Sequence, residues 1–494
     1  MKKCTIFTEK QMINSKVEPT IFGSFLEHLG RAIYTGIYDE NHPKSNKDGM
    51  RMDVAEAVKD MGVSIVRYPG GNFVSNYNWR DGIGPKENRP KRLELHWQSV
   101  EPNQFGTDEF MKWCELVNTS PMMAVNLGSG TIKQAQELVE YCNHEYDTEL
   151  SEERIRNGSR KPYGVKYWCL GNEVDGCWQA GHMSAIDYAK KAYEAAKLMK
   201  WTDETIKVVA CGSSSCDMPT FPNWDREVLE YGYDQFDYIS MHEYDWPQTN
   251  DLDYFASYYK MNKYINTIKT TINYVKAVKR TDKDVFISFD EWNVGDQSLP
   301  KKGNWEIAPS LFEQKYTLKD ALVMGGMLNT LINNSDVVKI ACLAQLVNVV
   351  APIITDKTDG ILKQAIYIPF SLASKYASNG ISMKQIISSP TFESRYGEVN
   401  YISSSIVVFD DAINILVANY SDEDIKLEVK LDSFENLEAI EHLTLDGPDL
   451  KITNTFDHPN RVKMRNLDLP AVDGNKITAT LPKLSWNVIR IKRN

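Results

Sequence analysis

The sequence lacks any long hydrophobic run. No segment of its 494 residues approaches the roughly 18 consecutive apolar residues that a membrane-spanning helix needs. Its first residues include lysines but no apolar core of the kind that a secretory signal carries. These two absences argue against a membrane span and predict a cytoplasmic protein.

Positive charge is also in short supply. The chain has 56 lysines and arginines against 67 aspartates and glutamates, which gives a formal net charge of -11, and neither sign forms a block. A nucleic-acid-binding protein would need a basic patch or stripe, so we expect no nucleic-acid partner.

Cysteine is sparse, with 8 residues at irregular spacings. The nearest pair, Cys211 and Cys216, has no matching second pair that could complete a zinc site. We therefore expect reduced, mostly buried thiols and neither a metal nor another cofactor.

The chain does contain a repeated alternation of two kinds of segment. Eight short apolar, β-branched runs, each ending in glycine, asparagine, serine or charged residues, span 19–25, 63–71, 121–130, 165–173, 207–215, 237–245, 285–293 and 338–346. Segments with helical periodicity lie between them, at 53–62, 107–118, 131–142, 186–201, 258–279 and 317–332. This alternation predicts an α/β fold, a (β/α)8 TIM barrel with buried parallel strands. A doubly wound open sheet is the alternative, but no GxGxxG or Walker-type loop follows the first run.

After about residue 385 the pattern changes to strand-like alternation. Such runs occupy 399–410, 412–421, 425–434, 437–445 and 476–494, and Asp-Gly turn signals begin at Asp446 and Asp473. This pattern predicts a C-terminal antiparallel β-sandwich of jelly-roll type. We therefore expect two domains, a catalytic barrel over 16–384 and a sandwich over 385–494.

The carboxyl ends of the barrel strands meet at the mouth of a TIM barrel, where active sites lie. The chemically capable residues at the ends of the eight runs therefore form a list of site candidates. They are Glu27, His28, Arg67, Gly70, Gly71, Asn72, Asn172, Glu173, Trp178, His242, Glu243, Tyr244, Asp290, Glu291, Trp292, Asn293, Gln345 and Asn348.

Two carboxylates on this list, Glu173 after the fourth run and Glu291 at the end of the seventh, predict catalysis. An isolated glutamate could be a loop residue or a helix cap, but each of these two has an asparagine and a tryptophan within five residues in the sequence. Glycoside hydrolysis with retention uses one protonated and one ionised carboxyl, roughly 5 to 5.5 Å apart. We expect Arg67 and Tyr244 to keep Glu291 ionised, and the less compensated Glu173 to stay protonated.

Several blocks of the sequence, in order, resemble the signature segments of glycoside hydrolase family 51, the α-L-arabinofuranosidases. They are FGSFLEHLGRAIYTGIYDE, VRYPGGNFVSNYNWRDGIGP, WCLGNEVDGCWQAGH, CGSSSCDMPTF, DYISMHEY, FISFDEWNV and KIACLAQLVNVVAPI. The likeness runs through nearly the whole chain. It implies a retaining, exo-acting enzyme that removes terminal non-reducing arabinofuranosyl residues from arabino-oligosaccharides, arabinan or arabinoxylan fragments.

The resemblance also implies roles for single residues. Glu173 would be the general acid/base and Glu291 the nucleophile, while Asn172 would bind the sugar 2-hydroxyl and Tyr244 would orient Glu291. The remaining substrate-binding set is Glu27, Arg67, Asn72, Trp178, His242 and Gln345. The resemblance further implies that an N-terminal strand from residues 1–15 joins the sandwich and that the chain forms a homo-oligomer, a hexamer in many relatives.

The sequence departs from that family after DEWNV, where many members carry a tryptophan and this chain has Gly295. An aromatic wall for the sugar must then come from elsewhere, with Trp178, Trp246 and Trp305 as candidates. Trp79 could also stack on a sugar or pack in the core.

Three other interpretations remain at this stage. A metal cluster of histidines and glutamates lacks the His-x-His and HExxH spacings. A β-glycosidase or endo-glucanase of the same barrel clan would share the carboxylate pair. A non-catalytic carbohydrate-binding barrel would be expected to have lost one of the two carboxylates, and both are present.

Overall fold

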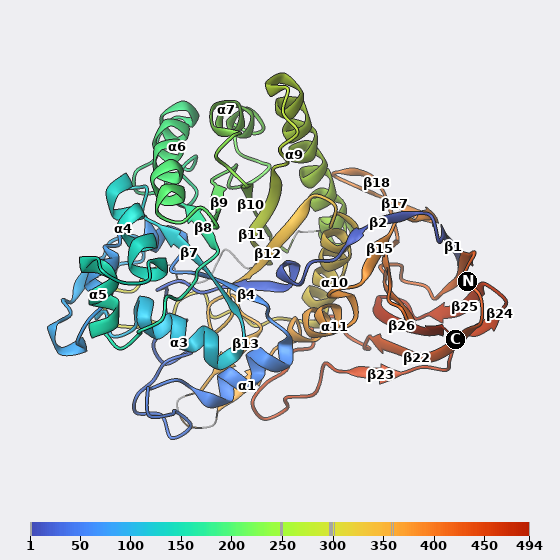
Figure 1. The fold of residues 1–494 in the computed structure, drawn as a ribbon. Coiled ribbons are helices and arrows are strands. Elements are labelled where there is room, and N and C mark those ends of the chain that lie inside the picture. The colour runs from blue at the N-terminus through green and yellow to red at the C-terminus, as the bar shows by residue number, and fades with distance from the viewer. Residues whose placement is uncertain are drawn as a thin grey trace.

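The computed structural model describes residues 2–247, 250–295, 300, 302–356, 358 and 360–493. A closed parallel barrel and a two-sheet β-structure lie side by side, and both chain ends lie in the second of these (Figure 1). The predicted combination of a TIM barrel and a C-terminal sandwich is confirmed.

Each of the eight predicted barrel strands is present, and every neighbouring pair is parallel. In chain order they are β3 (Gly23–Phe25), β4 (Ile65–Tyr68), β7 (Ser120–Val125), β8 (Tyr167–Leu170), β9 (Lys207–Ala210), β10 (Tyr238–Asp245), β11 (Phe286–Val294) and β12 (Val338–Ala344). The ring closes where β12 pairs with β3. A small cluster of inward-facing apolar side chains, including Phe25, Met122 and Ile340, fills the barrel.

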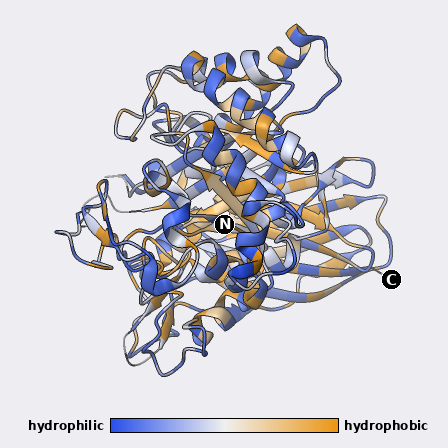
Figure 2. Ribbon diagram, turned by 60° about the vertical axis from the view of Figure 1, so that its left-hand side comes forward, coloured by the Kyte–Doolittle hydropathy of each residue, from blue (hydrophilic) through white to orange (hydrophobic). Residues whose placement is uncertain are grey.

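The six predicted helices are α1 (Met52–Met61), α3 (Thr107–Val117), α4 (Ile132–Asn143), α6 (Ala185–Thr202), α9 (Ser257–Lys279) and α10 (Leu318–Asn333). Two further helices complete the outer ring, α7 (Asn223–Gly232) and α11 (Tyr367–Ala377). The sequence analysis did not predict these two helices. Many outer helices are hydrophilic on one side and hydrophobic on the other (Figure 2). Within the described ranges, no helix is long and apolar enough to cross a membrane.

Shorter elements connect these layers. The helical ones are α2 (Gly71–Val74), α5 (Glu149–Arg156), α8 (Asp251–Phe255), η1 (Pro19–Phe22), η2 (Trp79–Gly82) and η3 (Lys86–Asn88). The two-stranded sheets are β5 (Arg92–Glu94) with β6 (Ser99–Glu101), β13 (Ile353–Thr355) with β14 (Ile361–Lys363), and β17 (Thr391–Ser394) with β18 (Gly397–Asn400).

The second unit consists of two sheets around their own apolar core. In spatial order the larger sheet is β2 (Ile13–Lys16), β15 (Ile381–Met383), β19 (Ile402–Val408), β20 (Ala412–Asn419), β26 (Ser485–Arg493), β22 (Leu437–Leu445) and β23 (Met464–Asn466). The smaller is β16 (Ile386–Ser388), β1 (Lys2–Glu9), β21 (Ile425–Asp432), β25 (Lys476–Leu481) and β24 (Ala471–Asp473). All pairings are antiparallel except β1 with β21, so the first residues of the chain do contribute strands here. The domain division at 384/385 stays a prediction, since β15 already pairs with β2 and β19.

Helix α10 packs against the larger sheet and lies between the barrel and the sandwich (Figure 1). Two adjacent glycines, Gly325 and Gly326, make this close packing possible. A Cβ atom at Gly325 would overlap the indole of Trp486, and one at Gly326 would overlap the hydroxyl of Tyr420. The barrel and the sandwich therefore meet at a point where α10 has no room for side chains.

We predict that Gly325→Ala lowers the melting temperature by a few degrees. At an open helix position the change would stabilise the protein by about 1 kcal/mol, but here overpacking against Trp486 costs about 1–3 kcal/mol. Thermal unfolding followed by circular dichroism measures the net sign. Ala277→Gly, on the exposed face of α9, is the control. It measures how much the difference in helix propensity between alanine and glycine alone changes the melting temperature. A raised melting temperature for Gly325→Ala would show that this contact does not restrict the interface.

Candidate active site

A recess with an empty volume of about 640 Å³ opens at the carboxyl ends of the barrel strands. It has carboxylates on its floor and aromatic and aliphatic side chains on its walls. Its lining residues are Phe25, Glu27, Leu29, Gly71, Asn72, Trp97, Glu173, Tyr244, Trp246, Glu291, Phe312, Gln345, Val349 and Val350. We call this the barrel recess.

Glu173 follows β8 directly, in a tight turn after Gly171. Its backbone has a φ of 43°, a left-handed conformation that costs a non-glycine residue roughly 1–3 kcal/mol and is concentrated at functional sites. The carboxylate accepts hydrogen bonds from Trp178 Nε1 at 2.8 Å and His242 Nδ1 at 2.9 Å. The buried strand therefore delivers this acid into the barrel recess, held by two donors.

Glu291 reaches the barrel recess because β11 contains a β-bulge. Ser288 pairs with Ser240 on β10, but the next pair joins Glu291 to His242, so β11 has one extra residue. The register on the β12 side shifts at the same place. In a regular strand two successive side chains face opposite sides, but here Asp290 and Glu291 both face the inside of the barrel.

Glu291 is held by two donors from two other barrel strands, one adjacent to β11 and one across the barrel. Arg67 Nη1 on β4 lies 2.7 Å from its Oε1, and the Tyr244 hydroxyl on β10 lies 2.8 Å from its Oε2. Arg67 also donates to Asn172 Oδ1 at 2.7 Å. These contacts are the ones expected from the strand ends.

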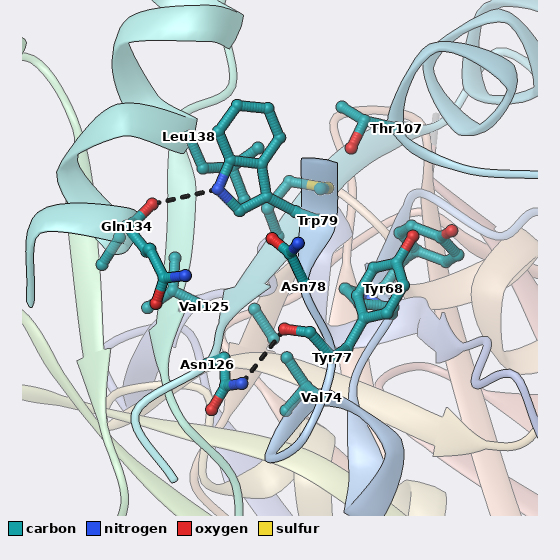
Figure 3. Close-up of a pocket in the computed structure, with 14 residues that line it drawn as sticks. Tyr68, Val74, Tyr77, Asn78, Trp79, Thr107, Val125, Asn126, Gln134 and Leu138 are labelled. Carbon is teal, nitrogen blue, oxygen red and sulfur yellow. Dashed lines mark hydrogen bonds between the residues drawn. The ribbon is translucent and has the colours of Figure 1, made fainter. Parts of the chain in front are cut away.

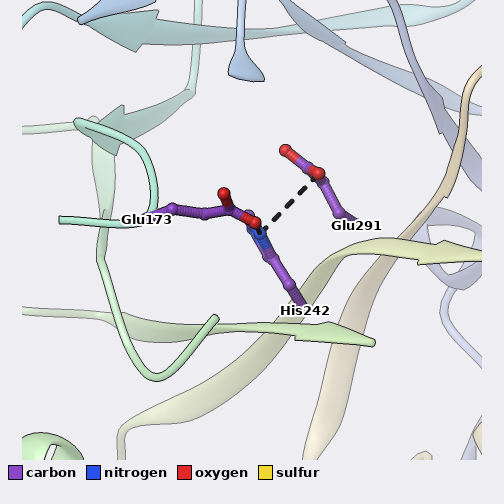
Figure 4. Close-up of side chains that lie close together, drawn as sticks. All are labelled: Glu173, His242 and Glu291. Carbon is purple, nitrogen blue, oxygen red and sulfur yellow. Dashed lines mark hydrogen bonds and ion pairs between the residues drawn. The ribbon is translucent and has the colours of Figure 1, made fainter. Parts of the chain in front are cut away.

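His242 lies between the two glutamates (Figure 4). One carboxylate oxygen of Glu173, one of Glu291 and a ring nitrogen of His242 all lie within 4.8 Å of one another. The Nδ1 atom is 3.7 Å from Glu291 Oε2, and Nε2 is 3.1 Å from Asp290 Oδ1. While Glu173 and Asp290 are both ionised, both ring nitrogens must donate, which is possible only for the charged imidazolium.

The electrostatics of the unliganded site match this assignment. Burial lowers the pKa of His242, but the negative charge of Glu291 and the hydrogen bonds to Asp290 and Glu173 outweigh it and raise that pKa to about 10. A metal ion bound by this trio would have to displace the Nδ1 proton and the hydrogen bond from Nδ1 to Glu173.

One electrostatic expectation was wrong, because Glu173 is not the less compensated carboxyl. Burial raises its pKa, but the hydrogen bond from His242 and that residue's charge outweigh burial, so the pKa lies below its ordinary value. Burial also raises the pKa of Glu291, and the charges of His242 and Arg67 do not fully offset it.

A second group of contacts surrounds Glu27. This buried carboxylate accepts from Phe73 N and from Trp97 Nε1, both at 2.9 Å, and Gln345 lies 3.3 Å from it. Burial raises the pKa of Glu27 well above its ordinary value. Gly71 has a φ of 59°, as expected for a turn glycine, and a Cβ there would overlap the Glu27 carboxylate.

The sequence-predicted residues separate into two layers. Glu27, Asn72, Glu173, Tyr244, Glu291 and Gln345 line the barrel recess. Arg67, Asn172 and His242 are almost fully buried and contact the lining carboxylates or one another. Trp178 is 46% exposed and contacts Glu173 from outside.

Other candidates point elsewhere: His28 contacts Glu101 and Tyr68, Glu243 contacts Lys260, and Asn348 contacts Thr355.

The aromatic wall is only partly the one expected. Trp246 lines the barrel recess and stacks on Tyr244, and a Cβ at Gly295 would overlap its ring. Sequence reasoning missed Trp97 and Phe312, which pack edge to face. Neither follows a barrel strand directly, so the strand-end rule could not find them.

Another cavity, of about 420 Å³, lies between the β4 and β7 ends and α4 (Figure 3). Its walls include Tyr68, Tyr77, Val125 and Leu138, and its described lining residues contain no carboxylate, histidine or thiol. Trp79 points into it and donates to the Gln134 carbonyl at 3.2 Å. Trp79 is therefore a core residue and does not reach the barrel recess. All eight cysteines are free thiols, as expected.

Comparison with protein families assigns most of the chain. Residues 57–275 match the family model described as the α-L-arabinofuranosidase 1 domain, and residues 290–485 match the one described as the α-L-arabinofuranosidase C-terminal domain. The second match begins on β11 at Asp290, beside Glu291, and continues through the sandwich.

Characterised relatives cover nearly the full length. The chain is 45% identical to an intracellular exo-α-(1→5)-L-arabinofuranosidase of Acetivibrio thermocellus, over 99% of this chain and 100% of that protein. It is 44% identical to an exo-α-(1→6)-L-arabinofuranosidase of Bifidobacterium longum, over 96% and 95%. Among solved structures, a family 51 α-L-arabinofuranosidase from Bifidobacterium longum superposes with a TM-score of 0.95, at 37% identity and 99% coverage of both chains.

We predict that Trp97→Phe lowers catalytic efficiency, because it removes the indole hydrogen bond that holds the Glu27 carboxylate. Phenylalanine keeps the apolar wall but removes the donor to a buried carboxylate, and such a bond is worth about 1.5–3 kcal/mol. We expect kcat/KM for an aryl α-L-arabinofuranoside, the substrate class that the resemblance implies, to fall roughly ten- to hundredfold. Trp201→Phe, at a 75% exposed position on α6, is the matched control. An unchanged kcat/KM for Trp97→Phe would remove Glu27 from the binding set.

Proposed function

The chain belongs to glycoside hydrolase family 51, the α-L-arabinofuranosidases, and from this premise we propose that it removes terminal, non-reducing α-L-arabinofuranosyl residues with retention of configuration. The substrates are arabino-oligosaccharides and fragments of arabinan or arabinoxylan. The relatives at 45% and 44% identity are named as exo-acting on (1→5) and (1→6) linkages respectively, so the linkage is left open.

The observation that carries the mechanism is the spacing of Glu173 and Glu291. Their nearest carboxylate oxygens lie within 4.8 Å of each other. A retaining glycosidase has its two carboxyl groups roughly 5–5.5 Å apart, whereas an inverting enzyme needs roughly 6.5–9.5 Å to leave room for a water molecule. The close spacing supports direct attack by one carboxylate on the sugar.

In the first step Glu291 attacks the anomeric carbon while protonated Glu173 donates its proton to the leaving oxygen. The glycosidic bond breaks, and a covalent arabinosyl ester forms on Glu291. Arg67 on β4 and Tyr244 on β10, the strand adjacent to β11, hold the attacking carboxylate in place. In the second step Glu173 takes a proton from water, and that water attacks the anomeric carbon and restores Glu291.

The remaining contacts hold the furanose ring. Glu27, Asn72 and Gln345 line the barrel recess and can bind ring hydroxyls, and Asn72 has a buried Oδ1 atom without a partner in the unliganded site. Asn172, placed by Arg67, is proposed to bind the 2-hydroxyl. Arg67 and His242 do not line the barrel recess, and they affect the substrate by holding Glu291 and Glu173 in place. Trp178 lies at the rim of the barrel recess and donates to Glu173.

A cytoplasmic location and a homo-oligomeric, hexameric assembly complete the proposal. The name of the Acetivibrio thermocellus relative describes an intracellular enzyme, which supports the location. Exposed apolar side chains on neighbouring segments, Leu93 on β5 and Trp305 and Ile307 beside β6, offer a surface that an oligomer could cover.

A substrate panel separates this function from its rivals. We expect the wild type to hydrolyse nitrophenyl α-L-arabinofuranoside far faster than the β-xyloside, β-glucoside or β-galactofuranoside, with rates unchanged by a chelator. Preference for a pyranoside would favour a β-glycosidase or glucanase of the same clan. Loss of activity with chelator would instead indicate a metal, and no turnover at all would indicate a binding protein.

Azide rescue assigns the two glutamates. On an aryl arabinofuranoside with a poor leaving group, we expect Glu173→Ala to lose roughly 10²–10⁴ in kcat, with a smaller loss when the leaving group is good. Azide should accelerate Glu173→Ala and give the α-azide. Glu291→Ala should lose activity on both substrates, and azide should then give the β-azide.

Glu56→Gln, at an exposed position on α1, is the control for this series and should match the wild type. Near-normal activity in either folded alanine variant, or azides of the opposite configuration, would contradict the assignment.

A further inference from the structure

The bulge in β11 places a second acid, Asp290, inside the barrel next to Glu291. Asp290 is 1% exposed and does not line the barrel recess, so it cannot touch a sugar. Its Oδ1 atom accepts from the Ser240 hydroxyl and from His242 Nε2, the latter at 3.1 Å. Its Oδ2 lies 3.8 Å from Arg67 Nε and 3.7 Å from Cys169 Sγ.

The other ring nitrogen of His242, Nδ1, faces Glu173 and Glu291. This nitrogen lies 2.9 Å from Glu173 Oε1 and 3.7 Å from Glu291 Oε2. The charged and titratable groups that face this ring come from three directions. They are Glu173 and Asp175 after β8, Asp290 and Glu291 on β11, and Arg67 on β4.

Resting on the function proposed above, we propose that Asp290 is a positioning residue that holds His242 in its doubly protonated, positively charged form between Glu173 and Glu291, and so fixes the pH range over which the pair works. A carboxylate on Nε2 can only accept a hydrogen bond, so it requires a proton on that nitrogen. Glu173 requires the Nδ1 proton in the same way whenever its carboxyl is ionised. The ring therefore carries both protons, and its charge stabilises the ionised forms of both glutamates.

The Asp290→Asn substitution removes the requirement for a proton on His242 Nε2. Its amide can donate to an unprotonated Nε2, so a neutral imidazole that still donates from Nδ1 to Glu173 becomes the favoured form. The positive charge closest to the glutamates is then lost, which raises the pKa of both carboxyls. Both limbs of the bell-shaped dependence of kcat/KM on pH should move to higher pH, since both report the coupled pair.

The test compares Asp290→Asn with His242→Gln. These variants remove charges of opposite sign, yet we expect the pH profiles of both to move upward, by about one pH unit. A purely electrostatic effect of the lost aspartate would move the Asp290→Asn profile downward. A purely structural role would lower the rate without moving the profile. Either result would overturn the proposal. Ser240→Ala, which removes a donor to Asp290 without changing charge, should leave the profile in position.

A second readout does not depend on turnover. In protein with ¹⁵N-labelled histidine, with the His242 signals assigned from their loss in His242→Gln, the wild-type ring should remain doubly protonated at pH 8 and the Asp290→Asn ring should be neutral. A ring in the same state in both proteins would refute the proposal, whatever the substrate. An inactive wild type with a charged His242 would instead refute the proposed function and leave the role of Asp290 intact.

Discussion

The active site depends on the balance of charge buried under the barrel recess. Three carboxylates, Glu173, Asp290 and Glu291, lie against two cations, Arg67 and the imidazolium of His242. Carboxylates taken out of water cost several kcal/mol each unless they are paired and hydrogen-bonded. Each of these has both kinds of partner. The ion pairs and hydrogen bonds that offset the desolvation cost of these three carboxylates also fix their positions relative to a sugar.

Strand geometry explains how so many charges converge. Parallel strands alternate their side chains, so a regular strand offers only every second residue to the barrel interior. On β10 this alternation directs His242 and Tyr244 inward, while Glu243 and Asp245 pair with Lys260 on α9. On β11 the bulge breaks the alternation and supplies two successive acids. The proposed nucleophile, Glu291, and the proposed positioning residue for His242, Asp290, therefore occupy adjacent positions in the chain.

Much of this could be predicted from the sequence. The eight barrel strands and six of the helices follow from hydrophobic periodicity, and the strand-end rule found both glutamates, Arg67, Tyr244 and Gln345. It could not find Trp97, which reaches the barrel recess from the β5–β6 hairpin. Nor could it foresee the bulge, because one inserted residue leaves no trace in a single sequence. The sequence analysis expected Glu173 to be the less compensated glutamate, but it accepts hydrogen bonds from Trp178 and His242, and spacing along the chain does not encode such contacts.

The proposed mechanism requires Glu291, held by Arg67 and Tyr244, to form the covalent bond to the sugar. The most direct measurement uses Glu173→Ala with an arabinofuranoside that has a good leaving group. Without its base this variant hydrolyses the ester slowly, so rapid acid quenching and peptide mapping by mass spectrometry can locate the attached sugar. We expect a burst of released aryl alcohol and a pentosyl group on the peptide at Glu291. A pentosyl group on Glu27 or Asp290, or a reaction without a burst or adduct, would contradict it.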